Sequence, residues 1–190
     1  MKQNRWILLG TILILSVLAL TGCGQPKPQE VVTSFLDALA EGRYADAEEL
    51  IEGTDEEKGY LFGTLNSGAQ SEEEKEADRI LACIFQSIRY GEVGNVCINE
   101  DVCTVSAELT TLDAAILMQN AADEIEGAKE GSDRSIEEIR LEHFQAKDAP
   151  RMTKTVEISL QKTGEVWKIR YDPVLLEGVT GGLTNCFIVE

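Results

Sequence analysis

Two stretches in which apolar and polar residues alternate are the strongest constraint on the fold of this chain. A period of two residues is typical of strands with one buried face and one solvent-facing side. A strand over 90–98 precedes the first stretch through a turn at 99–101, and a strand over 166–171 follows the second through a turn at 163–165. We therefore expect two hairpins in an antiparallel sheet of about four strands. The alternating apolar residues are Cys103, Val105, Ala107 and Leu109 in the first stretch and Val156, Ile158 and Leu160 in the second.

Helical periodicity surrounds these strands. Apolar spacing predicts helices from Pro28 to Gly42, over about 44–51, and over about 71–88, where Ser71 and Glu74 form a capping-box pattern. The polar, glycine-rich segment 54–70 is expected to be irregular, with one short turn that returns to the core. That turn contains the apolar residues Tyr60, Leu61, Phe62 and Leu65.

Further helices are predicted on either side of the second hairpin. Helical patterns over 113–129 and 135–146 form an insertion at about 113–147 between the hairpins, and Asp172-Pro173 opens a short helix through Leu176. The fold class is therefore α+β, with N-terminal helices packed on a curved sheet. We expect the domain to span 30–182, followed by an apolar tail at 183–190.

The first residues have the pattern of an export signal. Lys2 and Arg5 precede an uncharged apolar run from Trp6 to Leu20, which is shorter than the roughly 20 residues of a membrane-spanning helix. The run ends in Leu20-Thr21-Gly22-Cys23, which resembles the lipobox of bacterial lipoproteins. This predicts a signal peptide over 1–22, a diacylglyceryl group on Cys23, and a tether over 23–29. The alternatives are a secretory signal without lipid and an uncleaved anchor.

Charge excludes one class of partner. The chain has 17 basic and 34 acidic residues, a formal net charge of −17. Loss of residues 1–22 would remove Lys2 and Arg5 and no acid, so the mature chain would be more acidic still. Such a surface repels phosphate backbones, and we expect no nucleic-acid partner. The same charge, with a proline-containing tether, would hold a lipid-anchored domain off an anionic bilayer.

The cysteines suggest disulfides. Besides Cys23, the chain contains Cys83, Cys97, Cys103 and Cys186. An exported protein meets oxidising conditions. If 99–101 form a hairpin turn, Cys97 faces Cys103 at a distance suited to a disulfide, and Cys83 would pair with Cys186. The alternative is four reduced thiols. No CxxC pair is present, and we expect no metal site.

Two segments carry a resemblance to a family. They are Val31–Ile51, with Phe35-Leu36-Asp37-Ala38-Leu39 and Gly42-Arg43-Tyr44-Ala45-Asp46-Ala47, and the hairpin Val156–Tyr171 with Trp167-Lys168-Ile169. Together with the lipobox, they resemble Gram-positive bacterial lipoproteins of unknown function whose domain is similar to the nuclear transport factor 2-like (cystatin-like) cone. The resemblance covers most of 28–182, and the stretch 113–146 departs from a minimal cone. It implies a curved sheet around a helix with a concave pocket, and it brings no catalytic residues.

The residues offer little catalytic chemistry. His143 is the only histidine, and its available acids are Glu142 and Asp148; we expect a packed or surface side chain. The acidic groups at 99–101 and 123–126 lack the spacing of an EF-hand loop. No nucleophile, zinc or phosphate-loop motif is present, so we expect no cofactor. The aromatic residues Phe85, Tyr90, Trp167 and Tyr171 either line a pocket or belong to the core.

These observations predict a non-catalytic, lipid-anchored protein at the outer face of the cytoplasmic membrane. It would bind a small ligand, a peptide or a surface protein. The alternative is a small envelope enzyme, isomerase-like or hydrolase-like, with an acidic residue in the pocket of the cone. A buried Asp or Glu facing an open cavity would favour the enzyme.

Overall fold

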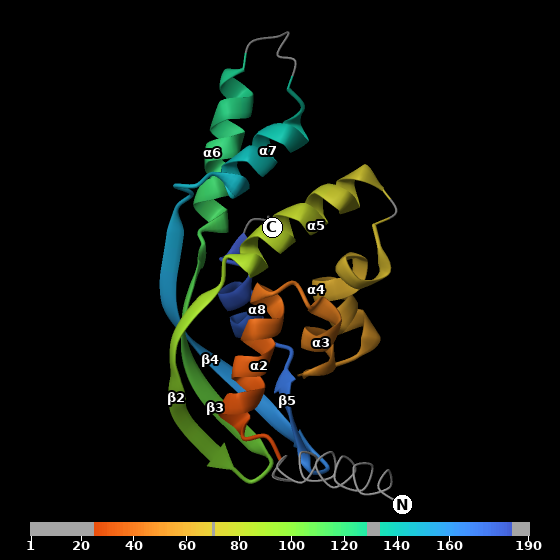
Figure 1. Cartoon of the computed structure of the whole chain (residues 1–190), viewed down its shortest axis with the longest axis vertical. Coiled ribbons are helices and arrows are strands. Elements are labelled where there is room, and N and C mark those ends of the chain that lie inside the picture. The colour runs from red at the N-terminus through yellow and green to blue at the C-terminus, as the bar shows by residue number, and fades with distance from the viewer. Residues whose placement is uncertain (1–24, 70, 129–133, 184–190) are drawn as a thin grey trace, which may run out of the picture.

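A five-stranded sheet forms the frame of the molecule (Figure 1). The structure, a computed structural model, describes residues 25–69, 71–128 and 134–183. The sheet is open and has the order β1-β5-β4-β3-β2, with every neighbouring pair antiparallel except β1 and β5. Its strands are β1 (Ile51–Glu52), β2 (Arg89–Asn99), β3 (Val102–Leu112), β4 (Arg151–Thr163) and β5 (Val166–Arg170).

The sheet contains both predicted hairpins, and it has an additional strand, β1, at its edge. The hairpins are β2–β3 and β4–β5, and β3 pairs with β4 along its whole length. The sequence pattern places Ile51 at the end of a helix, but it starts strand β1, so the sheet is mixed and has five strands: the four expected antiparallel ones and the parallel β1. Ile51 instead pairs in parallel with Ile169, and its side chain is buried at 1% exposure. The strand β2 is irregular, with register shifts between Tyr90 and Val93 and between Gly94 and Cys97.

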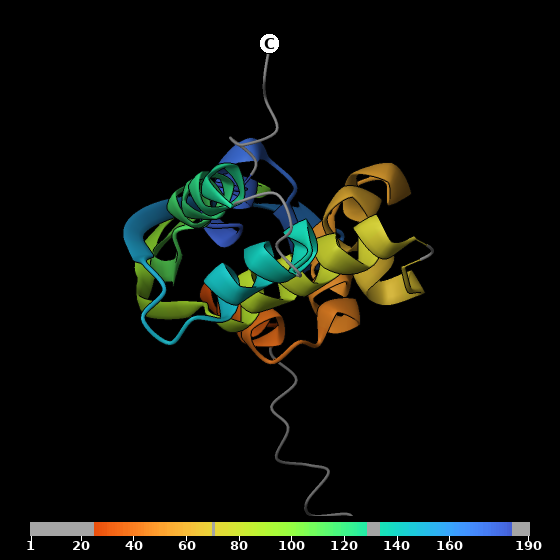
Figure 2. The same ribbon diagram turned by 90° about the horizontal axis from the view of Figure 1, so that it is seen from above.

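Seven helices of the described chain cover one face and one end of this sheet (Figures 1 and 2). The capping box predicted at Ser71 is formed, and Ser135 forms another, because each hydroxyl accepts a hydrogen bond from the backbone N–H three residues on. The α+β class is therefore confirmed. The helices are α2 (Pro28–Ala40), α3 (Tyr44–Glu49), α4 (Asp55–Ser67), α5 (Glu72–Gln86), α6 (Ala114–Gly127), α7 (Ile136–Gln145) and α8 (Pro173–Val179).

Helix α4 replaces the irregular segment expected at 54–70. Its N-cap is Thr54, whose side chain accepts a hydrogen bond from the Glu57 backbone N–H, and the Glu57 carboxylate accepts one from the Thr54 N–H at 2.7 Å. Leu61 and Phe62 are buried at 3% and 1% exposure. The expectation that these two side chains return to the core is correct, although the backbone that carries them is a full helix.

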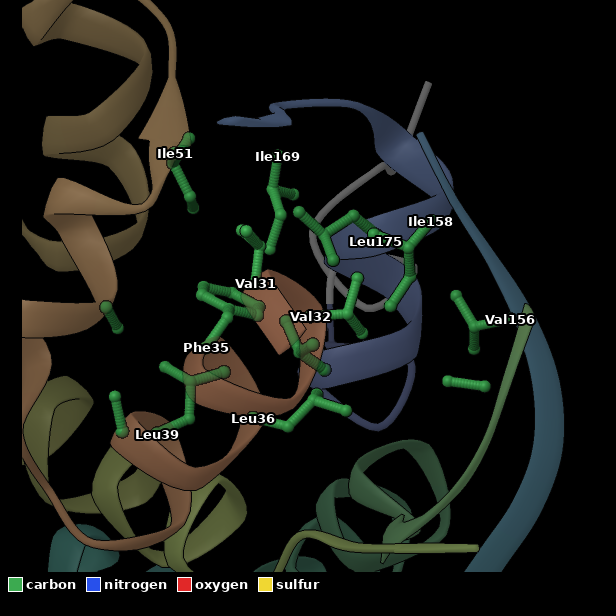
Figure 3. Packing of buried hydrophobic residues seen from close by; sticks show 14 of the residues in the cluster. Val31, Val32, Phe35, Leu36, Leu39, Ile51, Val156, Ile158, Ile169 and Leu175 are labelled. Atoms are coloured by element: carbon green, nitrogen blue, oxygen red, sulfur yellow. The ribbon is translucent and has the colours of Figure 1, made fainter. Parts of the chain in front are cut away.

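The main core lies between α2 and the inner face of the sheet (Figure 3). Helix α2 presents Val32 and Leu36 toward the inward residues of β4 and toward α8, and Phe35 is buried on the adjoining side of the helix; all three side chains have no solvent exposure. The alternating residues predicted for β3 and β4 are all buried in this cluster. Each buried aliphatic or aromatic side chain stabilises the fold by about 1.5–3 kcal/mol relative to an exposed one.

A second, smaller core joins α5, α6 and α7 to the end of the sheet. It contains Ile80 and Ile84 of α5, Leu117 of α6 and Phe144 of α7. The buried Ser87 fixes the junction, because its hydroxyl donates to the Ile84 carbonyl at 2.6 Å and accepts from the Leu112 N–H at 2.9 Å. The α6–α7 pair between β3 and β4 is therefore packed on α5 and does not stand apart from the domain.

Candidate binding pocket

An apolar pocket of about 390 Å³ lies beside the second core. Its floor is buried, and its rim includes the exposed residues Glu73 and Ala77. Five helices contribute to the wall, and Thr180 and Leu183 extend it beyond the end of α8. The lining residues are Leu61, Glu73, Glu76, Ala77, Ile80, Leu81, Met118, Arg140, Leu176, Thr180 and Leu183.

Helix α5 supplies the longest part of the wall. Its lining residues, Glu73, Glu76, Ala77, Ile80 and Leu81, follow the spacing that places side chains on one face of a helix. The capping box at the start of α5 fixes where this face begins. The apolar stripe predicted from the sequence thus continues past the core and lines the pocket.

One end of the pocket is charged. Arg140 Nη1 of α7 donates to Glu76 Oε1 of α5 at 3.2 Å, and the Glu76 side chain is only 13% exposed. Glu73 lies on the same face of α5, one turn earlier. The pocket therefore combines apolar walls with a mouth of two carboxylates and one guanidinium, an arrangement suited to an apolar ligand that has a polar end.

Glu76 is the lining acid that bears on an enzymatic role. A general base must offer a carboxylate oxygen to the proton that it removes. In this structure Glu76 Oε1 is engaged by Arg140, which balances the charge of the carboxylate. The geometry thus resembles a binding wall more than an acid–base site.

The four aromatic candidates do not line this pocket. Phe85 and Trp167 are buried in the main core, at 0% and 9% exposure, and Tyr171 packs against it half-buried. The Tyr90 hydroxyl donates to Asp37 Oδ1 at 2.6 Å. That hydrogen bond to a carboxylate, with burial second, raises the pKa of Tyr90 to about 12. These four residues stabilise the fold, which is the core alternative considered for them above.

His143 belongs to a polar cluster between α6 and α7. Its Nε2 lies 3.0 Å from Glu124 Oε2, and Arg134 also pairs with Glu124 and, at 2.6 Å, with Glu142. The Arg134 guanidinium, and then His143, hold the pKa of Glu124 below its usual range. The acid that faces His143 is thus Glu124, and not Glu142 or Asp148 as the sequence suggested. This cluster ties the two helices together outside the pocket.

The structure gives no sign of a metal site at the acidic residues 123–126. Glu124 is already engaged by Arg134 and by the His143 ring. Within the described ranges, no three His, Cys, Asp or Glu side chains are gathered as metal ligands would be. A polar cleft of about 380 Å³ beside α2 and α3 contains Asp46, whose carboxylate is paired with Arg43 at 2.6 Å. Its lining has three carboxylates and two basic side chains, and Leu50 is its one apolar lining residue among those described, so it is a weaker candidate for an apolar ligand than the first pocket.

The register of the β2–β3 hairpin corrects the geometry expected for Cys97 and Cys103. The turn contains two residues, at 100–101, so Cys97 pairs with Thr104 and Cys103 pairs with Ile98. Successive residues of a strand point to opposite faces of the sheet, and paired residues point to the same face. Because Cys103 pairs with Ile98, the neighbour of Cys97, the two cysteine side chains lie on opposite faces. Cys97 is accordingly exposed and Cys103 buried, and both are free thiols in the structure.

The disulfide expected between Cys83 and Cys186 remains a prediction. Cys83 is a half-buried free thiol on α5, and burial raises its pKa. Cys186 lies outside the described residues, as does Cys23 with the whole predicted signal peptide. Among the described residues, no helix has both the length and the apolar character needed to span a membrane.

Comparisons with known proteins give one structural likeness. No protein-family model matches the chain, and no curated protein matches it. Among solved structures, the chain is similar to ycdA, a proposed lipoprotein from Bacillus subtilis subsp. subtilis strain 168, with a TM-score of 0.46 and 20% sequence identity. The match covers 72% of this chain and 49% of that chain, so this chain spans about half the length of its structural neighbour.

Proposed function

We propose that this protein is a lipid-anchored, extracytoplasmic binding protein, held at the outer face of the cytoplasmic membrane through Cys23. The support for the anchor is the basic start, the apolar run and the lipobox-like sequence that ends at Cys23. A diacylglyceryl group supplies two acyl chains, which suffices for stable anchoring. The single observation that carries the binding role is the apolar pocket on α5.

The ligand that best fits this pocket is a small apolar molecule with a basic or hydrogen-donating end. A volume of about 390 Å³ lies within the range of about 300–1,000 Å³ found for small-molecule sites. Walls formed by Ile80, Leu81 and Met118 favour an apolar body, because each Å² of apolar surface removed from water contributes about 25 cal/mol. Glu73 and Glu76 outnumber Arg140 at the mouth, which favours a cationic end over an anionic one.

The binding role is tested with the neutral apolar fluorophore Nile red. It is titrated into residues 23–190 carrying Cys23→Ser, and into the same chain ending at residue 183. Ala77→Trp fills the pocket from its exposed rim, whereas Ala115→Trp on α6 adds the same exposed indole away from the lining.

We expect saturable binding with one site, weakened at least tenfold by Ala77→Trp and unchanged by Ala115→Trp. Absence of saturable binding to both chain lengths, or equal weakening by the two tryptophans, would overturn the proposal. A cationic alkylamine should displace Nile red at lower concentration than an alkyl carboxylate of equal length, because the mouth carries a net negative charge.

A further inference from the structure

We propose that the apolar segment 184–190 occupies the α5 pocket when no ligand is bound, so that the segment and a ligand compete for it. The competition rests on the function proposed above, whereas the docking of the segment stands by itself. The occupant is chosen because the chain runs into the pocket: Leu176, Thr180 and Leu183 all line it, and residue 184 follows the last of them directly.

The direction of the chain at this point is fixed by several hydrogen bonds. After α8, the Gly182 N–H donates to the Glu177 carbonyl at 3.0 Å, and the Leu183 N–H donates to the Thr180 carbonyl at 3.2 Å. The Gly181 carbonyl accepts from the Ala114 N–H at 3.0 Å. Leu183 is thereby held in the wall at 8% exposure, as a member of the second core. The segment that follows starts at the wall of the pocket and needs no long linker to reach it.

The composition of the segment matches the pocket. Four consecutive residues, Cys186-Phe187-Ile188-Val189, are apolar. Seven extended residues span at most about 25 Å, which is more than enough to cross a pocket of this size. Exposed runs of this kind are unfavourable in water, and the wall offers Ala77, Leu81 and Met118 to cover them. Because the segment is attached beside the pocket, its effective concentration there is in the millimolar range.

Cys83 offers an independent way to detect whether segment 184–190 docks in the pocket. It lies on α5 three residues after the lining residue Ile80, on the same side of the helix, packs against the second core and is half-buried. A segment that enters the pocket brings Cys186 to the same helix. The two thiols then come within reach of a disulfide, whose Cα atoms must lie about 4.4–6.8 Å apart.

The first test compares Nile red affinity in residues 23–190 and 23–183, both with Cys23→Ser. If the segment fills the pocket in nine molecules of ten, its removal tightens the apparent Kd about tenfold. Phe187→Asp in the longer chain should give the same gain without any truncation. A synthetic peptide of residues 184–190 should displace the dye from the shorter chain, and a peptide of the same composition in scrambled order should do so more weakly. Equal Kd values for all three chains would overturn the proposal.

Failure of the small-ligand function is distinguishable from failure of this inference. If neither chain binds Nile red but the shorter one binds a fluorescein-labelled 184–190 peptide, the pocket is a site for this segment alone. The second test oxidises the longer chain, with Cys97→Ser, using copper phenanthroline and maps disulfides by mass spectrometry. A Cys83–Cys186 bond that decreases with Ala77→Trp and not with Ala115→Trp supports docking in the pocket. A bond formed equally in both variants overturns it.

Discussion

Gly181 is the position at which one added methyl group should cost most. Its φ is +61°, and a Cβ there would lie 2.1 Å from the Leu112 carbonyl oxygen. That oxygen belongs to the backbone at the end of β3, so it cannot move away by a side-chain rotation. For Gly181→Ala, the left-handed φ costs about 1–2 kcal/mol, and overpacking adds about 1–3 kcal/mol. We therefore expect a loss of about 2–5 kcal/mol in the free energy of unfolding.

Gly164→Ala is the matched control for this change. Gly164 has nearly the same φ, +65°, but no atom lies within 4 Å of its added Cβ. Gly164→Ala should lower the free energy of unfolding only by the cost of the left-handed φ, about 1–2 kcal/mol. Urea unfolding followed by circular dichroism measures the stability loss of both variants. In thermal unfolding, the midpoint should fall by roughly 4–20 °C for Gly181→Ala, at about 2–4 °C per kcal/mol. Equal losses in the two variants would refute the contact between Gly181 and Leu112.

Three further results are expected. Cys23→Ala should move the protein from the membrane fraction to the soluble fraction or leave it unprocessed, because the thiol is the proposed site of the lipid. Tyr90→Phe should cost about 0.5–1.5 kcal/mol at pH 7 by removing the hydrogen bond to Asp37. Its effect should fade between pH 10 and 12, because a phenol whose pKa rises from 10.0 to about 12 on folding stabilises the folded state below pH 10 and loses this contribution as the pH rises. In the folded chain a thiol reagent should label the exposed Cys97 much faster than the buried Cys103.

Each of these results has a contradicting outcome. Unchanged membrane partition of Cys23→Ala would exclude lipidation there. A stability difference for Tyr90→Phe that persists at pH 12 would show that the raised pKa is not the cause. A Cys97–Cys103 peptide in non-reducing mass mapping would contradict the register of the hairpin, in which Cys97 faces Thr104.

The sequence predicts elements well where the local signal and the tertiary packing agree. The alternation over Val156, Ile158 and Leu160 specifies a strand because a single face of the sheet is buried, and the structure buries these residues at 2% exposure or less. Capping residues such as Ser71 set helix starts by a contact three residues away. Such signals need no knowledge of the remainder of the chain.

The failures come from weak or distant signals. Helix α4 contains Gly59 and Gly63, which lower helix propensity and suggest a loop. The capping box of Thr54 and Glu57 was present in the sequence and could have identified this helix. Strand β1 could not be found locally, because two residues become a strand only through Ile169, more than a hundred positions further along the chain.

The pocket was the least predictable feature. Its lining comes from five helices and from the residues that follow α8, spread from Leu61 to Leu183, and the crossing geometry of the helices is not encoded in any one segment. The aromatic residues Phe85 and Trp167 drew attention by their size, yet size favours the core equally well. The usable signal was the apolar stripe of α5, which continues past the residues that the core needs.

If copies of the chain share a membrane through the proposed anchor, the irregularity of strand β2 affects how they meet. This strand is an outer strand of the sheet, and outer strands of neighbouring copies can pair with one another and aggregate. Two interruptions of its ladder and the positive φ of Asn95, +49°, prevent a flat, regular row of donors and acceptors. Proteins anchored in two dimensions reach high local concentrations. In that setting the bends of β2 would keep adjacent copies from adding to one another's sheets.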